Sequence, residues 1–125
     1  MKDWTAIRER YLRDDLTIRL GGLAANLARI ASFSDHVGHQ LVVKDILVES
    51  EYFIEWLAPD ARLEIQAELV DLQVQLARWI VRLDQDWLDV GARHQMASLA
   101  KQWSQEILQR SGLLNAREPS EVARP

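Results

Sequence analysis

The stretch that decides the fold is residues 60–89, DARLEIQAELVDLQVQLARWIVRLDQDWLD. Its apolar residues recur alternately four and three positions apart, which is the spacing that places side chains on one face of an α-helix. This core stripe consists of Ile65, Leu69, Leu72, Leu76, Trp79 and Leu83. The sequence therefore predicts one long helix over about residues 60–89, with the core stripe packed against other helices.

Two further rows follow the same segment. One is polar, with acidic residues at its N-terminal end and basic residues toward its C-terminal end, as the helix dipole favours: Glu64, Glu68, Asp71, Gln75, Arg78, Arg82 and Gln85. The other is apolar and consists of Val70, Val74, Ala77 and Val81. An apolar surface of this width predicts burial against more than one neighbouring helix.

The same periodicity predicts helices over about residues 3–33, 39–57 and 91–111. The apolar phase of the first changes at Asp14 and Asp15, and Asp is a favourable N-cap. Either one helix is kinked there, or a short helix gives way to a second; a continuous helix with a local irregularity is favoured. Pro59 ends the segment over 39–57, and Gly112 is the expected C-cap of the last helix.

These segments predict an all-α fold. Because the connections are short, successive helices should be antiparallel, which gives an up-down-up-down four-helix bundle over residues 1–114. Residues 115–125 have no periodicity and few apolar side chains, so they are predicted to form a disordered C-terminal tail. No apolar run approaches the ~20 residues needed to cross a bilayer, and no membrane partner is expected.

The composition excludes several kinds of chemistry. The chain has no cysteine, which excludes disulfides, thiolate nucleophiles, zinc–thiolate sites and iron–sulfur clusters. Its first residues, from Met1 to Trp4, are polar and charged and continue into Arg8 and Arg10. They resemble neither a signal peptide nor a transit peptide, so a cytoplasmic location is expected.

The charge pattern bears on the class of partner. Residues 35–71 carry nine acidic and two basic side chains, which argues against nucleic-acid binding by the whole domain. Nucleic-acid binding at the N-terminus would need four cations to share a face that nearby carboxylates do not neutralise: Arg8, Arg10, Arg13 and Arg19. No nucleic-acid partner is therefore predicted.

Asp35, His36 and His39 cluster in the first loop and have the chemistry of metal ligands. No second cluster completes a coordination shell, so helix capping and loop polarity explain these residues better. No metal is predicted.

Paired glutamates could suggest a di-iron bundle, but such bundles need a Glu followed three residues later by a His on two helices. Glu51 and Glu55 lack that partner, and a solvated helix face accounts for them better. No catalytic residue, cofactor or metal ligand is predicted. Enzymatic activity stays open, with a non-enzymatic role favoured.

Small residues interrupt the first helix. Gly21 and Gly22, with Ala25 and Ala28, give a face of low bulk that suits a close helix–helix crossing, within the chain or across a two-fold axis. Trp4 and Trp87 lie near segment ends, where full burial is harder. Packing in the core is favoured for both, but exposed tryptophans would anchor a partner. The candidate interface is Trp4, Gly21, Gly22, Ala25, Ala28 and Trp87.

Two stretches, RLGGLAANLARI at residues 19–30 and ESEYFIEW at residues 49–56 with Ala58-Pro59 after it, carry a resemblance. Together they resemble a group of short, uncharacterised helical proteins of cyanobacteria, over about residues 4–114. The resemblance implies a cytoplasmic protein of a photosynthetic bacterium and implies no activity.

The leading functional prediction is a non-enzymatic interaction or scaffold module that forms a homodimer through helix faces, with a seam along the first helix. The motivation is the excess of apolar helix surface. The alternative is a bundle that binds a small apolar ligand or cofactor in its core, with or without enzymatic activity. That alternative predicts a cavity lined by Trp, Leu and isolated polar groups such as Ser50 or Asn26.

Overall fold

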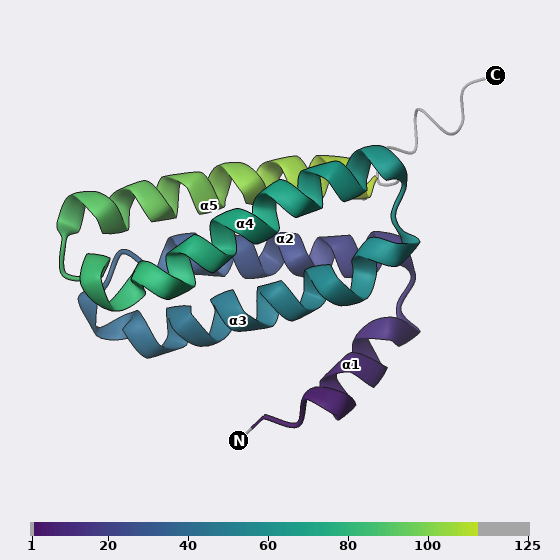
Figure 1. Ribbon diagram of the computed structural model, residues 1–125, viewed down its shortest axis with the longest axis horizontal. Coiled ribbons are helices and arrows are strands. Elements are labelled where there is room, and N and C mark those ends of the chain that lie inside the picture. Colours follow the sequence, from purple (N-terminus) through teal and green to yellow (C-terminus); the bar gives the residue numbers. More distant parts are fainter. Residues whose placement is uncertain (1, 113–125) are drawn as a thin grey trace.

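The structure is a computed structural model that describes residues 2–112, and all regular structure in this range is helical (Figure 1). Its α-helices are α1 (Trp4–Arg13), α2 (Leu16–Phe33), α3 (Gln40–Leu57), α4 (Leu63–Asp86) and α5 (Val90–Ser111). Single 3-10 turns, Val37–His39 and Ala58–Asp60, lie on either side of α3. The predicted all-α class is confirmed for these residues. The predicted domain end at 114 and disordered tail over 115–125 lie outside the described residues.

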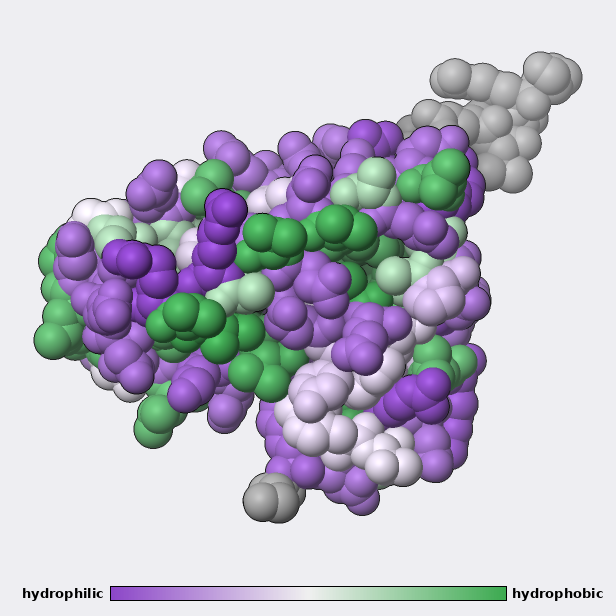
Figure 2. Space-filling view, in the orientation of Figure 1, coloured by the Kyte–Doolittle hydropathy of each residue, from purple (hydrophilic) through white to green (hydrophobic). Residues whose placement is uncertain are grey.

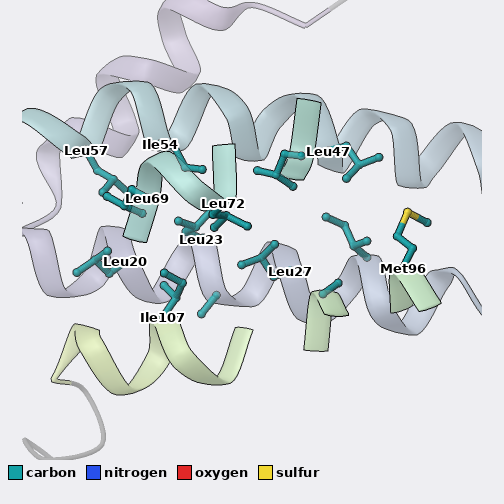
Figure 3. Close-up of a cluster of buried hydrophobic side chains, with 14 of the residues drawn as sticks. Leu20, Leu23, Leu27, Leu47, Ile54, Leu57, Leu69, Leu72, Met96 and Ile107 are labelled. Carbon is teal, nitrogen blue, oxygen red and sulfur yellow. The ribbon is translucent and has the colours of Figure 1, made fainter. Parts of the chain in front are cut away.

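Helix α2 lies at the centre of the packing. It packs along both α5 and α3, α3 packs along α4, and α4 contacts α5 less closely because it crosses obliquely (Figure 1). Side chains from these four helices meet in one hydrophobic core (Figure 3). The core includes Leu20, Leu23, Leu27, Leu47, Ile54, Leu57, Leu69, Leu72, Met96 and Ile107. The core stripe of α4 is buried as predicted, except that Trp79 is half-buried.

The first helical segment is broken, and the favoured prediction of a continuous helix was wrong. Helix α1 ends at Arg13, and Asp14 has an extended backbone with φ −78° and ψ 152°. Asp15 is the N-cap of α2, where its Oδ1 accepts a hydrogen bond from the Ile18 N–H at 3.0 Å. Because an aspartate cap satisfies backbone donors that a continuous helix would bond internally, the two aspartates favour a new helix start.

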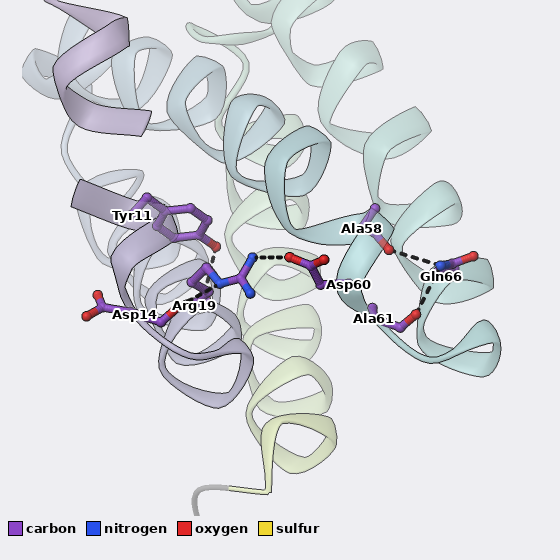
Figure 4. Close-up of polar contacts among 7 residues, drawn as sticks. All are labelled: Tyr11, Asp14, Arg19, Ala58, Asp60, Ala61 and Gln66. Carbon is purple, nitrogen blue, oxygen red and sulfur yellow. Dashed lines mark hydrogen bonds and ion pairs between the residues drawn. The ribbon is translucent and has the colours of Figure 1, made fainter. Parts of the chain in front are cut away.

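A buried arginine ties this break to the turn between α3 and α4 (Figure 4). The Arg19 Nε donates to the Asp14 carbonyl at 3.0 Å, and its Nη1 lies 3.0 Å from the Asp60 carboxylate. The Tyr11 hydroxyl donates to the Arg19 carbonyl at 2.7 Å. These bonds hold α1 at a fixed angle to α2, so that α1 lies as an arm beside α3 (Figure 1).

The turn after α3 is closed by a side chain of α4. Pro59 lies in the 3-10 turn that follows α3, in agreement with the predicted stop. The Gln66 Nε2 donates to the carbonyls of Ala58 and Ala61, each at 3.0 Å (Figure 4). Helix α5 ends at Ser111, and Gly112 has a φ of +81°, the left-handed conformation of a glycine C-cap. The predicted cap is confirmed.

Candidate functional site

The surface of α4 carries an apolar stripe that no part of residues 2–112 covers. Val70, Val74 and Val81 expose 57%, 48% and 80% of their surface, and Leu63, the first residue of α4, exposes 78%. Leu88, in the turn directly after α4, exposes 76%. Ala67 and Ala77 are also exposed and complete what we call the α4 stripe. The row Val70, Val74, Ala77 and Val81 was expected to be buried against a second neighbouring helix. Its exposure means that the second neighbour implied by the sequence is missing from the described part of the fold.

The α4 stripe lies on the helix face opposite the core. Each stripe residue within α4 precedes a residue of the core stripe by two positions, which corresponds to ~200° around the helix. From Leu63 to Val81 the residues are spaced four and three apart, the heptad pattern by which helices pair. Hydrophobic surface breaks the charged surface along α4 on this side of the molecule (Figure 2). Helix α4 therefore has two apolar faces, one in the core and one toward solvent.

Charged residues flank the α4 stripe in an ordered way. The N-terminal half of α4 carries Glu64, Glu68 and Asp71, and the C-terminal half carries Arg78 and Arg82. The row of side chains directly beside the stripe therefore changes from acidic to basic along the helix, while Asp84 and Asp86 make the C-terminal half of α4 neutral in total.

Some of these charges are already paired within the chain. Glu68 accepts from Arg110 at 2.6 Å, and Arg82 pairs with Asp86 at 3.1 Å. Glu64, Asp71 and Arg78 form no ion pair within residues 2–112. Asp71 and Arg78, near the middle of the stripe, are therefore free to pair with a partner.

A groove of about 260 Å³ opens between α4 and α5. Its apolar wall includes Trp79, Met96 and Leu99, and its rim includes Arg78 and Arg82. Sites for drug-sized ligands usually measure ~300–1,000 Å³, so this groove is below that range. It exists because α4 crosses α5 obliquely and the two helices contact each other little.

The polar groups expected in a ligand cavity do not line this groove. Ser50 is buried, and its hydroxyl donates to the Ile46 carbonyl at 2.8 Å. Asn26 donates to the Glu49 carboxylate at 3.1 Å. Ser50 therefore bonds within α3, and Asn26 links α2 to α3.

Trp87 is buried in the core, so it does not belong to the candidate interface in which the sequence placed it. Only 1% of its surface is exposed, and its Nε1 donates to the Val37 carbonyl at 2.6 Å. The Arg93 guanidinium lies over the indole, 5.5 Å from the ring centroid, and donates to the carbonyls of Ser34 and Trp87. The turn between α4 and α5 folds the indole inward against the first loop, so Trp87 cannot anchor a partner.

Trp4 is half-buried in an aromatic cluster that joins α1 to α3. Its ring centroid is 4.3 Å from that of Tyr52 and 6.4 Å from that of Trp56. Tyr11 stacks on Phe53 with a centroid distance of 4.0 Å. Packing of the arm therefore explains most of the Trp4 surface.

The small-residue face of α2 divides between two environments. An added Cβ at Gly22 would lie 3.7 Å from the Tyr11 ring, so the glycine sits directly beneath that side chain. Gly21 is half-buried, whereas Ala25 and Ala28 are exposed. These four residues lie far from the α4 stripe in the chain and supply little apolar area, since none has a side chain larger than methyl.

The two histidines of the first loop contact backbone atoms of the same loop and of the end of α2. The His36 Nδ1 accepts from the Gly38 N–H at 3.2 Å, and His39 contacts the Phe33 carbonyl at 3.3 Å. Asp35 lies at the surface. Among residues 2–112 there is no group of three or more His, Cys, Asp or Glu side chains placed to hold a metal ion.

Glu51 is an exception to the predicted solvated face of α3. It is half-buried between α3 and α4, and its Oε1 is buried with no hydrogen-bond partner in the described structure. Burial, and to a smaller extent the neighbouring charge of Glu55, raises the pKa of this carboxyl above its ordinary value. The carboxylate form is therefore less stable here than in the unfolded chain.

Glu51→Gln is expected to raise the free energy of unfolding at neutral pH, by about 0.5 kcal/mol or less because solvent screens the partly exposed group. The Glu51 carboxyl binds its proton more tightly in the folded protein than in the unfolded chain. The wild type therefore regains stability as the pH falls through the raised pKa of Glu51. The advantage of the variant should therefore disappear below the ordinary pKa of Glu. Urea unfolding across pH measures it.

Glu106→Gln, on the exposed side of α5, is the matched control. It removes the same charge without a buried oxygen. Equal pH dependence for the two variants would contradict the assignment of the effect to burial at Glu51.

Comparisons with protein-family models, curated protein sequences and solved structures found no match to this chain. They give no support to the resemblance to cyanobacterial helical proteins. In addition, no helix among residues 2–112 is long and apolar enough to span a bilayer.

Proposed function

We propose that this chain is a non-enzymatic interaction module. In this proposal α2 to α5 form an up-down-up-down four-helix bundle with α1 as an arm, and the bundle associates with other helices through the α4 stripe. The proposal keeps the cytoplasmic location and the self-association expected from the sequence. The proposal places the dimer interface on α4, whereas the sequence predicted it along the first helix.

The observation that carries the proposal is the exposure of Leu63 and three valines on one face of α4, with the exposed Leu88 in the turn that follows. Scattered exposed apolar residues are normal on protein surfaces. A contiguous apolar stripe at heptad spacing is different, because it matches the surface that a helix buries when it pairs with another helix. The ordered charges beside the stripe favour association with a specific partner over nonspecific hydrophobic association.

The small-residue face of α2 offers a weaker basis for association. Buried apolar area stabilises an interface by ~25 cal/mol per Å², and alanine and glycine present much less of it than valine and leucine. The groove between α4 and α5 likewise supports ligand binding less well, because of its size and because the rim residue Arg82 is already paired.

The experiment that tests self-association is the molar mass of the chain as a function of concentration. Light scattering or sedimentation equilibrium should give twice the 14.4 kDa chain mass at ~100 μM, a concentration at which dimers of micromolar affinity are formed. The monomer mass should return on dilution. A mass of one chain at every concentration would contradict the proposal that the module self-associates.

A further inference from the structure

We infer that a second copy of this chain covers the α4 stripe, with the two α4 helices antiparallel about a two-fold axis between Gln75 and Leu76. The inference rests on the proposed function and specifies the partner and the register of the same surface. It is argued from the positions of the stripe residues and from the charges beside them.

An axis at this position aligns the two stripes along their whole length. Val70 meets the partner's Val81, and Val74 meets the partner's Ala77. At the ends Leu63 lies opposite the turn after the partner's α4, where Leu88 is, so that these two highly exposed leucines cover each other. Isologous contacts of this kind occur twice in a two-fold dimer.

One kind of layer in this register, which occurs twice in the dimer, is polar. Ala67 faces the partner's Asp84, which breaks the apolar row between Val81 and Leu88. Asp84 already accepts a hydrogen bond from Gln40 at 2.8 Å. Its carboxylate is therefore directed to α3, and the small alanine opposite it leaves room.

The unpaired charges select the antiparallel direction. Side chains that flank an antiparallel seam on the same side meet each other, so Asp71 lies beside the partner's Arg78, and Arg78 beside the partner's Asp71. Both belong to the three flanking charges, with Glu64, that have no ion pair within residues 2–112, and Glu64 lies beside the partner's neutral Gln85 in this arrangement. A parallel pair would place the flanking positions of the two copies on opposite sides of the seam, with Asp71 beside the partner's Gln66 and Arg78 beside the partner's Gln73, and would form neither opposite-charge pair.

The same charges fix the register. Sliding one helix by a heptad in one direction places Asp71 against the partner's Asp71. Sliding it in the other direction places Arg78 against the partner's Arg78 and Val74 against the partner's Asp84. Only the central register combines apolar layers with two opposite-charge pairs.

Single cysteines test this register directly, because the wild-type chain has none. Val70→Cys and Val81→Cys lie on an exposed face, so neither should disturb folding. After oxidation, an equimolar mixture of the two variants should give a disulfide-linked dimer. Each variant alone should give little, because 11 residues of helix rise place its two copies ~16 Å apart along the seam, too far for a disulfide.

Efficient cross-linking of either variant alone would overturn the antiparallel arrangement. The molar mass of the same samples distinguishes failure of self-association from failure of the proposed α4 interface. A dimer that does not cross-link in the mixture would refute the α4 seam and leave self-association intact. A monomer would refute both.

Charge reversal gives a second readout that needs no disulfide. Asp71→Arg and Arg78→Asp should each weaken self-association by about tenfold, since each places like charges together at two points. Mixed in equal amounts, the two variants should form a heterodimer tighter than either homodimer, because both charge pairs then become attractive. Unchanged homodimers, or no preference for the mixed pair, would overturn the inferred register.

Discussion

Trp87→Ala is expected to lower the free energy of unfolding by about 4 kcal/mol, which is the cost of removing a large aromatic side chain from a close-packed core. The indole is 1% exposed, and its loss also removes the hydrogen bond to the Val37 carbonyl and the ring beneath Arg93. Urea unfolding followed by circular dichroism measures the change. Variant and wild type must be compared at one low concentration, since association would add to the apparent stability.

Trp4→Ala is the matched control, because Trp4 is half-buried on the α1 arm. Its expected cost is smaller, about 1–2 kcal/mol. If Trp87→Ala fails to fold, Trp87→Phe keeps most of the packing and should lose about 1 kcal/mol with the hydrogen bond. A Trp87→Ala chain as stable as the wild type but unable to associate would restore this residue to the interface.

The double substitution Val74→Gln/Val81→Gln is expected to raise the dissociation constant of the dimer about 1,000-fold. It removes two valines from each copy of the seam, and about 1 kcal/mol for each of the four gives about 4 kcal/mol. The stability of the isolated chain should change little, because both side chains are exposed and Gln is a better helix former than Val. Sedimentation equilibrium measures the dissociation constant.

The control is Leu41→Gln/Val42→Gln, which replaces two exposed apolar residues of α3. This double variant removes a similar amount of exposed apolar surface, but from a helix face that is not part of the α4 stripe. Association weakened equally by both double variants would indicate that exposed apolar area in general, and not the α4 stripe, holds the copies together.

The sequence was sufficient to predict the helices of the core, because periodicity alone reports which face of each helix is apolar. It predicted the core stripe of α4 and the cap at Gly112, and both are present. It failed at Asp14 and Asp15, because the balance between a kinked helix and a new capped helix depends on Arg19, which bonds the Asp14 carbonyl and Asp60 from a distant turn.

The candidate site was only partly predictable. The Val70 row was recognised as apolar, but periodicity cannot say whether an apolar face is covered by the same chain or by another. Trp87 was placed among the interface candidates because it lies near a helix end. Its burial depends on the first loop folding across the indole and on Arg93 from α5, and neither contact leaves a local signal.

The most direct test of the account is an isotope-filtered NOE experiment on a mixture of ¹³C-labelled and unlabelled wild-type chains, which detects only contacts between copies. The account predicts methyl contacts from Val70 to the partner's Val81 and from Leu63 to the partner's Leu88. Contacts between copies that involve Ala25 and Ala28 of α2 and spare α4 would contradict it, as would the absence of any contact between copies.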